Sequence, residues 1–313
     1  MKKILLLLLI CFAQNLFAQE TFTYDDFRYT INENNEITII RYRGSLSSLD
    51  IPSVIDGKTV TTIGDEAFSD CDSLRSITIP DSVATIGGYA FNDCDLLTSI
   101  AIPNSVTTIG PNAFSNCDAL KSITIPNSVT TIGRCAFSGC DSLTNITIPD
   151  SVTIIDARAF LDCKSLTNIT IPNSVTTIGD EAFSNCDALK SITIPNSVTT
   201  IGEDAFSNCK SLTNIEISEN NETFTVIDNI LYDKKEKMLH TCFSKKTNIV
   251  IPNGILKINN SDFSNCDSLR SITIPNSVTT IGEYAFSGCR SLKSIIIPNS
   301  VTTIGEGAFY NCR

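Results

Sequence analysis

Apolar and polar residues alternate along this chain in a pattern that returns every 23 residues. In the reference segment 74–94, Ile77 and Ile79 alternate with Ser76 and Thr78, which is typical of a short strand with one buried face. Pro80 ends this strand, because proline has no N–H to donate to a continuing ladder. The pattern predicts short strands that stack in parallel and in register, each ending in Ile-Pro at Ile51, Ile79, Ile102, Ile125, Ile148, Ile171, Ile194, Ile251, Ile274 and Ile297.

The string Ala-Phe-x-x-Cys, or a close variant, marks each repeat. Its members lie 23 residues apart except for one interval of 57 residues, which equals 23 plus an irregular unit of 34. Self-similarity of this period indicates a solenoid whose units bury their apolar faces against their neighbours, here in about eleven turns. The phenylalanines that mark the repeats are Phe68, Phe91, Phe114, Phe137, Phe160, Phe183, Phe206, Phe263, Phe286 and Phe309.

Two further features predict the backbone of the outer connection. The column of Gly87 contains only Gly, Asp and Asn, the residues that tolerate positive φ, and this predicts a left-handed backbone there. The segment after it, as in 180–183, carries acidic residues where the first turn of a short helix would lie. The helix dipole explains these acids without a catalytic role. They are Glu66, Glu181, Glu203, Glu283 and Glu306.

The first 45 residues lie outside the repeat. Residues 1–18 combine Lys2 and Lys3 with an apolar run and end in Leu-Phe-Ala, which predicts a cleaved export signal; a retained anchor is the alternative. In residues 19–45, the segments 27–31 and 36–40 flank a turn-rich run of Asn and Glu. This arrangement predicts a β-hairpin that caps the first open turn of the stack.

An irregular turn at about residues 219–246 interrupts the period. The segments 230–232 and 238–240 flank a charged run, which predicts a second hairpin. Inserts of this kind are either binding sites or tolerated loops, so Tyr232 and His240 are candidate binding residues. His240 is the only histidine, and no nucleophile-elbow or acidic-partner motif accompanies it. We therefore expect it to face outward on the hairpin, without a catalytic role.

The repeat resembles a known family. The order Leu-x-x-Ile-x-Ile-Pro-x-x-Val-x-x-Ile-Gly-x-x-Ala-Phe-x-x-Cys looks like the 23-residue leucine-rich repeat of BspA-like bacterial surface proteins, and it covers nearly all of residues 46–313. The resemblance implies an α/β repeat solenoid that is right-handed and curved. A parallel β-sheet would form the concave side, short helices or turns the convex side, and the β-hairpin the N-terminal cap. In function it implies a secreted or cell-surface protein on the extracellular or periplasmic side that binds other molecules, often in adhesion.

Charge and motifs narrow the function further. The chain has 23 basic and 34 acidic residues; removal of Lys2 and Lys3 leaves 21 basic residues and a net charge of −13. Nucleic acid and anionic lipid are not expected partners, because the clustered Lys and Arg that bind them are lacking. After the signal, no apolar stretch predicts an integral membrane span. No phosphate-binding loop, catalytic constellation or cofactor motif is found, so we expect a non-enzymatic protein without a cofactor.

Cysteine occupies its own column. Side chains in register point the same way, whereas a disulfide needs them to converge at a dihedral of about 90°. Buried thiols are therefore predicted, with disulfides between turns as the alternative in an exported protein. The spacing also provides no paired metal ligands. Cys135 and Cys242 lie outside the column, and Cys135, in an acidic column, is predicted to be the first thiol to react.

The outward positions of the predicted sheet form the main candidate binding surface. They carry Ser, Asn and Thr, and an adjacent column has scattered Lys and Arg. Such a surface can hold a protein strand or a glycan through many weak contacts, although Ser and Thr also simply suit solvated strands. The predicted binding residues are Arg75, Ser76, Thr78, Lys121, Thr124, Thr147, Thr170, Lys190, Thr193, Glu216, Arg270 and Thr273.

The sequence thus predicts an exported binding module for an extracellular protein or glycan, with two alternatives. The chain ends at Arg313, partway through a repeat, so an open C-terminal turn would allow self-association or assembly. A more remote alternative is ice binding, because Thr pairs such as Thr107-Thr108 recur in ladders. Thr is also common near turns for backbone reasons.

Overall fold

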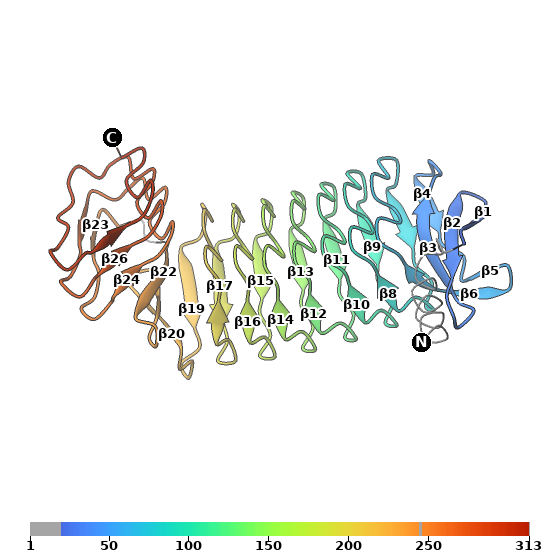
Figure 1. Cartoon of the computed structure of the whole chain (residues 1–313), viewed down its shortest axis with the longest axis horizontal. Coiled ribbons are helices and arrows are strands. Elements are labelled where there is room, and N and C mark those ends of the chain that lie inside the picture. Colours follow the sequence, from blue (N-terminus) through green and yellow to red (C-terminus); the bar gives the residue numbers. More distant parts are fainter. Residues whose placement is uncertain (1–19, 244–245, 313) are drawn as a thin grey trace, which may run out of the picture.

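The chain forms an elongated solenoid of about 12 turns with parallel sheets (Figure 1). The computed structural model describes residues 20–243 and 246–312. The predicted export signal, residues 1–18, lies outside these described residues. None of the described residues belongs to a helix of the length and apolarity needed to cross a membrane.

Strands of three or four residues, one from each turn, form a parallel array that we call the first ladder. Ser122 pairs with Asn145, and Thr124 with Thr147, so neighbouring turns are in register. The predicted stacking of the strands is therefore confirmed. The strands are β4 (Ser48–Asp50), β7 (Ser76–Thr78), β9 (Ser99–Ala101), β11 (Ser122–Thr124), β13 (Asn145–Thr147), β15 (Asn168–Thr170), β17 (Ser191–Ile194), β19 (Asn214–Ile217), β23 (Asn248–Val250) and β25 (Ser271–Thr273).

A second array, which we call the second ladder, was not predicted. Most of its strands have two residues, too few to show an alternating pattern in the sequence. Thr62 pairs with Thr85, which continues to Thr108 in the next turn. The strands are β6 (Lys58–Ile63), β8 (Thr85–Ile86), β10 (Thr108–Ile109), β12 (Thr131–Ile132), β14 (Ile154–Ile155), β16 (Thr177–Ile178), β18 (Thr200–Ile201), β24 (Lys257–Ile258), β26 (Thr280–Ile281) and β27 (Thr303–Ile304).

The outer connection consists of turns, and the prediction of short helices is wrong: the described residues contain no helix. Positive φ recurs within each connection, as at Glu66 (56°) and Asp70 (58°). The N–H groups of Glu66, Phe68 and Asp70 donate to carbonyls of the following turn at 2.9, 2.8 and 2.9 Å. These bonds run between turns, whereas a helix would use them internally, so a helix dipole does not explain the acidic residues here.

The glycine column has a different cause from the one predicted. Gly87 does not have positive φ, so the expected left-handed backbone is wrong. A Cβ at Gly87 would lie 2.6 Å from the backbone N of Asp65, and one at Gly282 would lie 2.6 Å from the carbonyl carbon of Asn259. Glycine is favoured at Gly87 and Gly282 because consecutive turns approach closely there. Asp156 and Asn259 occupy the same column with a side chain, so the approach is not equally close at every turn.

The core contains a continuous stack of aromatic rings. From Phe68 to Phe206, successive ring centroids lie 5.1 to 5.6 Å apart with interplanar angles of 8° or less. Tyr42 of the cap extends this stack, with its ring 5.6 Å from that of Phe68. The ladders and the outer turns enclose these rings, and each phenylalanine from Phe68 to Phe206 is buried.

The cysteine column lies beside this stack. The Sγ of Cys94 donates to the carbonyl of Phe68 in the preceding turn at 3.1 Å, and Cys117 and Cys140 repeat the contact with Phe91 and Phe114. The ten cysteines of the column are thiols, as predicted; six of them are buried, whereas Cys71, Cys209, Cys266 and Cys312 are half-buried. The Sγ–H bonds add a reason for cysteine at this position, because they satisfy a buried carbonyl.

The predicted N-terminal hairpin is confirmed and has an additional strand. Strands β1 (Phe22–Tyr24), β2 (Phe27–Ile31) and β3 (Ile37–Tyr42) are antiparallel, and β3 pairs in parallel with β6. The cap therefore begins the second ladder and adds a turn to the stack. Beside it, β5 (Val54–Ile55) forms a small hairpin with β6.

The irregular turn contains a third strand besides the predicted hairpin. Strands β20 (Phe224–Ile227), β21 (Ile230–Asp233) and β22 (Met238–Cys242) are antiparallel, and β22 pairs in parallel with β24. Leu231 belongs to the core of the preceding turns, whereas Ile230 and Tyr232 belong to that of the following turns. Strand β21 therefore divides the core, and in Figure 1 the turns after β22 are inclined to those before β19.

Candidate ligand-binding face

The first ladder brings the predicted binding residues together on one surface. Its apolar residues, such as Ile123 and Ile146, are buried, whereas the residues on either side of them point outward. Ser76 is half-buried and donates to the Ser48 hydroxyl at 2.9 Å. We call this outward surface the ladder face. Its exposed predicted members are Thr78, Thr124, Thr147, Thr170, Thr193, Glu216 and Thr273.

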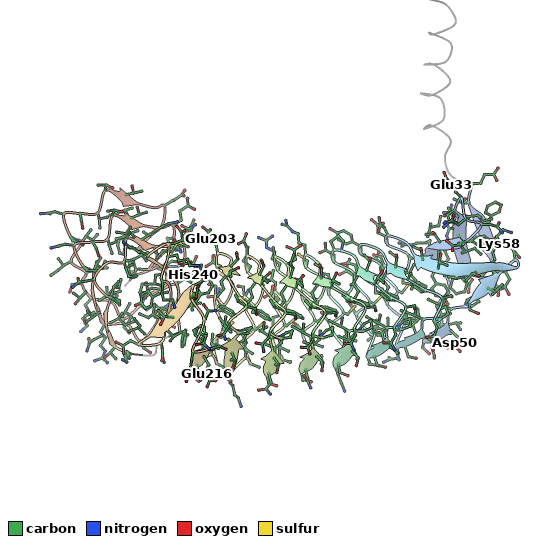
Figure 2. The ribbon with its side chains drawn as sticks, turned by 90° about the horizontal axis from the view of Figure 1, so that it is seen from below. Glu33, Asp50, Lys58, Glu203, Glu216 and His240 are labelled. Carbon is green, nitrogen blue, oxygen red and sulfur yellow. The ribbon has the colours of Figure 1, made fainter. Side chains whose placement is uncertain are left out.

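Asp50 and Glu216 lie on this side of the solenoid, near the two ends of the regular turns (Figure 2). Glu216 accepts hydrogen bonds from the Asn214 amide at 2.9 Å and from the Thr193 hydroxyl at 3.5 Å. Its carboxylate is therefore partly engaged by the face itself. Between these two acids, the outward residues of strands β7 to β17 are uncharged Ser, Asn, Thr and Ala.

Exposed cations border the ladder face at the residue before four of its strands. Arg75, Lys121, Lys190 and Arg270 occupy this column, and no ion pair of the described residues involves any of them. The outer turns differ: Lys164 lies 2.9 Å from Asp141 of the preceding turn, in one of several such pairs. The cations beside the ladder face are therefore available to a ligand, whereas Lys164 and Lys210 on the outer turns are already paired with aspartates.

A shallow groove lies on the ladder face over β13 and β15. Its volume is about 510 Å³, and it brings the predicted Thr147 and Thr170 together with the amides of Asn145 and Asn168. Asp150 at its edge was not predicted as a site residue. The only sequence signal for this groove is the replacement of Ser by Asn in two consecutive turns, at Asn145 and Asn168.

The Thr pairs near the second ladder have a structural use. The Thr107 hydroxyl donates to the Ala84 carbonyl at 3.4 Å, and those of Thr176 and Thr302 donate to the preceding turn at 3.3 Å. The first hydroxyl of these pairs therefore satisfies the backbone of a neighbouring turn. Backbone geometry explains this ladder of Thr without a lattice-matching ligand.

Tyr232 and His240 lie inside the protein, and the predicted outward position of His240 is wrong. Their exposed fractions are 2% and 7%. Strand β22 is covered by β21 on one side and β24 on the other, and the His240 ring packs edge-on against Phe224 at 5.5 Å. Burial lowers the pKa of His240 to about 4. In this position neither side chain reaches a ligand at the surface.

Asp262 also departs from the repeat, since it stands in the alanine column. It is buried, and burial raises its pKa well above the usual value. Its Oδ2 accepts a hydrogen bond from the Asn259 N–H at 2.6 Å. Among the described residues, no group of three or more His, Cys, Asp and Glu side chains is arranged to hold a metal ion.

Comparisons with known proteins agree with this architecture. The family described as "BspA type Leucine rich repeat region (6 copies)" matches residues 38–167, 130–234 and 235–313. No match was found among curated proteins.

Three crystal structures resemble the chain. A leucine-rich cell surface protein from Faecalibacterium prausnitzii is 34% identical, with a TM-score of 0.81 over 94% of this chain and 87% of that one. A leucine-rich repeat protein from Bacteroides ovatus is 32% identical, with a TM-score of 0.70 over 93% and 80%. A leucine-rich repeat protein from T. pallidum is also 32% identical, with a TM-score of 0.57 over 62% and 91%.

Proposed function

From the premise that this chain belongs to the BspA-type leucine-rich repeat family, we propose that it is an exported, non-enzymatic binding protein of the bacterial surface. Its ligand is an extracellular protein or glycan, which it binds on the ladder face in adhesion. The observation that carries this proposal is the column of unpaired cations beside a surface of hydroxyls and amides. On a chain with an excess of acidic residues, this surface offers both charge and hydrogen bonds to a partner.

The geometry favours an elongated ligand. Neighbouring strands of a sheet lie about 4.8 Å apart, so each turn presents similar donors and acceptors at that interval. A polypeptide or glycan along the solenoid would make many weak contacts of equal kind. Arg75, Lys121 and Lys190 would add attraction to acidic groups of the ligand, and this part of the affinity would weaken with salt.

Paired substitutions test this proposal. The variant Lys121→Ala/Lys190→Ala removes two cations of the ladder face, and Lys164→Ala/Lys210→Ala removes two from the outer turns. We expect the first variant to lose at least about tenfold in affinity for immobilised extracellular matrix proteins or glycans. The second should bind like the wild type. Equal binding by all three proteins would place the ligand elsewhere, and a wild type that binds none of these partners would contradict the proposal.

The irregular turn is a second possible location for the same activity. Deletion of residues 219–246 is unsuitable as a test, because β21 is part of both cores. Lys235 and Glu236 are exposed at the tip of the hairpin between β21 and β22. If Lys235→Ala/Glu236→Ala reduces binding more than Lys121→Ala/Lys190→Ala does, the site lies on this turn.

Self-association through the last turns is the alternative function. It is supported by exposed apolar side chains there: Ile296 is 84% exposed, Ile304 48% and Tyr310 62%. Burial of such groups between copies would be favourable. Light scattering on the wild type and on Ile296→Ser/Ile304→Ser tests it, because an oligomer that the substitutions dissolve would support assembly. A wild type that remains monomeric at high concentration would exclude it.

A further inference from the structure

Cys71 differs from the other members of the cysteine column. Each thiol of the column from Cys94 to Cys209 donates to a phenylalanine carbonyl of the preceding turn. Cys71 is the first of the column, and the cap precedes it in place of a regular turn. Its thiol donates to no backbone carbonyl among the described residues and contacts the Cys94 thiol. Cys71 is also half-buried, whereas Cys94 is buried.

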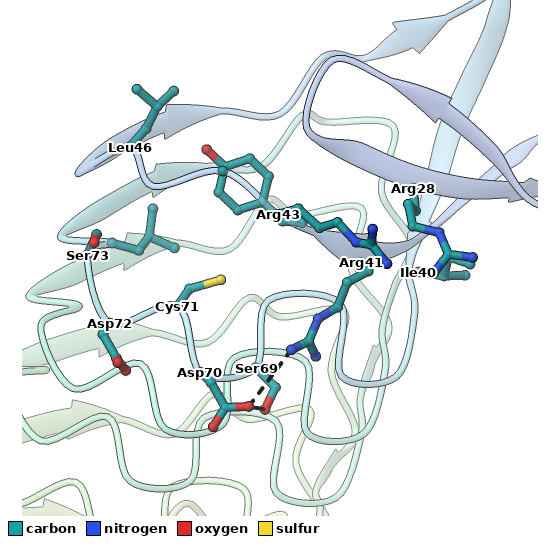
Figure 3. A pocket seen from close by; sticks show the side chains of 13 residues that line it. Arg28, Ile40, Arg41, Arg43, Leu46, Ser69, Asp70, Cys71, Asp72 and Ser73 are labelled. Atoms are coloured by element: carbon teal, nitrogen blue, oxygen red, sulfur yellow. Dashed lines mark hydrogen bonds and ion pairs between the residues drawn. The ribbon is translucent and has the colours of Figure 1, made fainter.

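Cys71 lines a cleft between the cap and the first turn. This cleft has a volume of about 720 Å³ and is also lined by Arg28, Arg41 and Arg43. In Figure 3 the Cys71 sulfur points from one wall toward the side that Arg41 and Arg43 occupy. Three arginines in one cleft form a local positive cluster on a protein with excess acidic residues.

The arginines are only partly neutralised. The Nη1 of Arg41 donates to the Glu66 carbonyl at 3.1 Å, and its Nη2 lies 3.9 Å from Asp70. Arg43 is exposed and takes part in no ion pair of the described residues. Asp72 also lines the cleft, so the positive charge is concentrated on the cap side.

Tyr42 lines the inner wall of the cleft. It is 4% exposed, and its hydroxyl has almost no accessible area, so this hydroxyl is closed off from a ligand in the cleft. Gly44 packs against it: a Cβ at Gly44 would lie 2.2 Å from the hydroxyl and 2.5 Å from an Asp26 carboxylate oxygen.

The surroundings of Cys71 also favour its thiolate. The contact with the Cys94 thiol lowers the pKa of Cys71 and the charge of Arg41 adds to this lowering, whereas burial and the charges of Asp70 and Asp72 oppose it. Burial raises the pKa of Cys140 and of Cys209 to about 12. Reactive cysteines are found in partly exposed, electropositive surroundings of the kind that Cys71 has.

We propose that Cys71 is a thiol–disulfide exchange site whose co-substrate is a small disulfide bearing carboxylates. The Cys71 thiolate attacks one sulfur of that disulfide, a new S–S bond forms and the original S–S bond breaks. The leaving half departs as a thiolate and takes up a proton from water, so Cys71 is oxidised and the small disulfide is reduced. Arg41 and Arg43 hold the carboxylates.

The mixed disulfide should persist. Cys94 is the nearest second thiol, but it is buried and its S–H donates to the Phe68 carbonyl, so it remains a thiol and does not attack. Cys135 is half-buried on the outer turns, next to the exposed Arg134. It therefore provides a control for a half-buried thiol that lies outside the cleft.

Oxidised glutathione and cystamine, which are anionic and cationic, are suitable probes. We expect intact-protein and peptide mass spectrometry to find the first glutathionyl group on Cys71, formed at least about tenfold faster than the cystamine adduct. Cys71→Ser should abolish this fast addition, Cys135→Ser should preserve it, and Arg43→Gln should remove most of the preference for glutathione. The unfolding midpoint of Cys71→Ser verifies that this variant is folded.

Either of two results would overturn the proposal. One is modification of Cys135, or of any other thiol, at the same rate as Cys71. The other is reaction of cystamine at Cys71 as fast as oxidised glutathione. Because the Cys135→Ser protein keeps the cleft intact, its rate at Cys71 decides the question even if Cys71→Ser does not fold.

Discussion

Close approach of the backbone determines which residue stands at Gly87. A Cβ there would lie 2.6 Å from the Asp65 backbone N, and backbone cannot move aside as the end of a flexible side chain can. The left-handed conformation lies instead at Tyr89 (φ 55°) and Asp93 (φ 56°), which are not glycines. The strain at these residues is sustained because their N–H groups bond to the following turn at 2.9 Å.

The neighbouring glycines Gly87 and Gly88 allow a matched test. Gly87→Ala should lower the free energy of unfolding by about 1–3 kcal/mol, the usual cost of overpacking. At Gly88 the nearest atom to an added Cβ is 3.3 Å away. Gly88→Ala should therefore change the free energy of unfolding by less than about 1 kcal/mol. Urea denaturation of both variants measures the difference. Similar values for the two would mean that close approach is not the reason for glycine at Gly87.

The residue types at fixed positions of the repeat predicted which side chains are buried, but they did not predict the backbone conformation of the outer connection. Ile, Val, Leu, Phe and Cys at fixed positions are buried because their side chains gain from leaving water wherever the repeat places them. Positive φ and close approach both select glycine, so the column of Gly87 alone did not distinguish them. The sequence also did not predict the burial of His240, because this burial depends on the strands that cover β22.

At the scale of elements, one buried side chain joins the irregular turn to the regular turns through hydrogen bonds. The Nδ2 of Asn221 donates to the carbonyls of Pro195 and Val198 at 2.9 and 3.1 Å. Its Oδ1 accepts hydrogen bonds from the N–H groups of Thr223 and Phe224 at 2.9 and 2.8 Å. Asn221 thereby replaces backbone pairing where the regular turns stop and β20 begins.

Removal of this side chain should loosen the irregular turn. Asn221→Ala leaves several buried backbone groups without partners, which should cost roughly 2–4 kcal/mol of stability. Asn220 is exposed, and Asn220→Ala should cost less than about 0.5 kcal/mol. Limited proteolysis should cut the Asn221→Ala protein within residues 220–242 faster than the wild type. Equal resistance of the two variants would argue against this role of Asn221.

The elements that the sequence predicted are those with enough residues to show a period. The strands of the first ladder and the two hairpins were predicted, because alternation over several residues is visible there. The second ladder was not predicted, because strands such as Thr85–Ile86 have only two residues. The outer connection was predicted as short helices or turns. The sequence did not decide between them, because inter-turn bonds such as that from Glu66 to Gly88 depend on how the turns stack.

The whole molecule consists of two solenoid blocks with separate cores. The aromatic stack stops at Phe206 and resumes from Phe263 to Phe286, where the centroids lie 5.0 Å apart. In the irregular turn, Leu231 faces one core while Tyr232 faces the other. In a repeat protein each turn is stabilised mainly by its neighbours, so cooperativity should weaken at such a break.

A destabilised core should therefore open only its own block. Phe286→Ala removes a buried ring from the C-terminal core, and Phe114→Ala removes the equivalent ring from the N-terminal core. Each substitution should cost about 3–5 kcal/mol locally. Hydrogen exchange followed by mass spectrometry should become faster in residues 249–312 for Phe286→Ala and remain unchanged in β7 to β15. Phe114→Ala should show the opposite distribution. A uniform increase along the chain in either variant would mean that β21 transmits stability between the blocks, and that the solenoid unfolds as one unit despite its divided core.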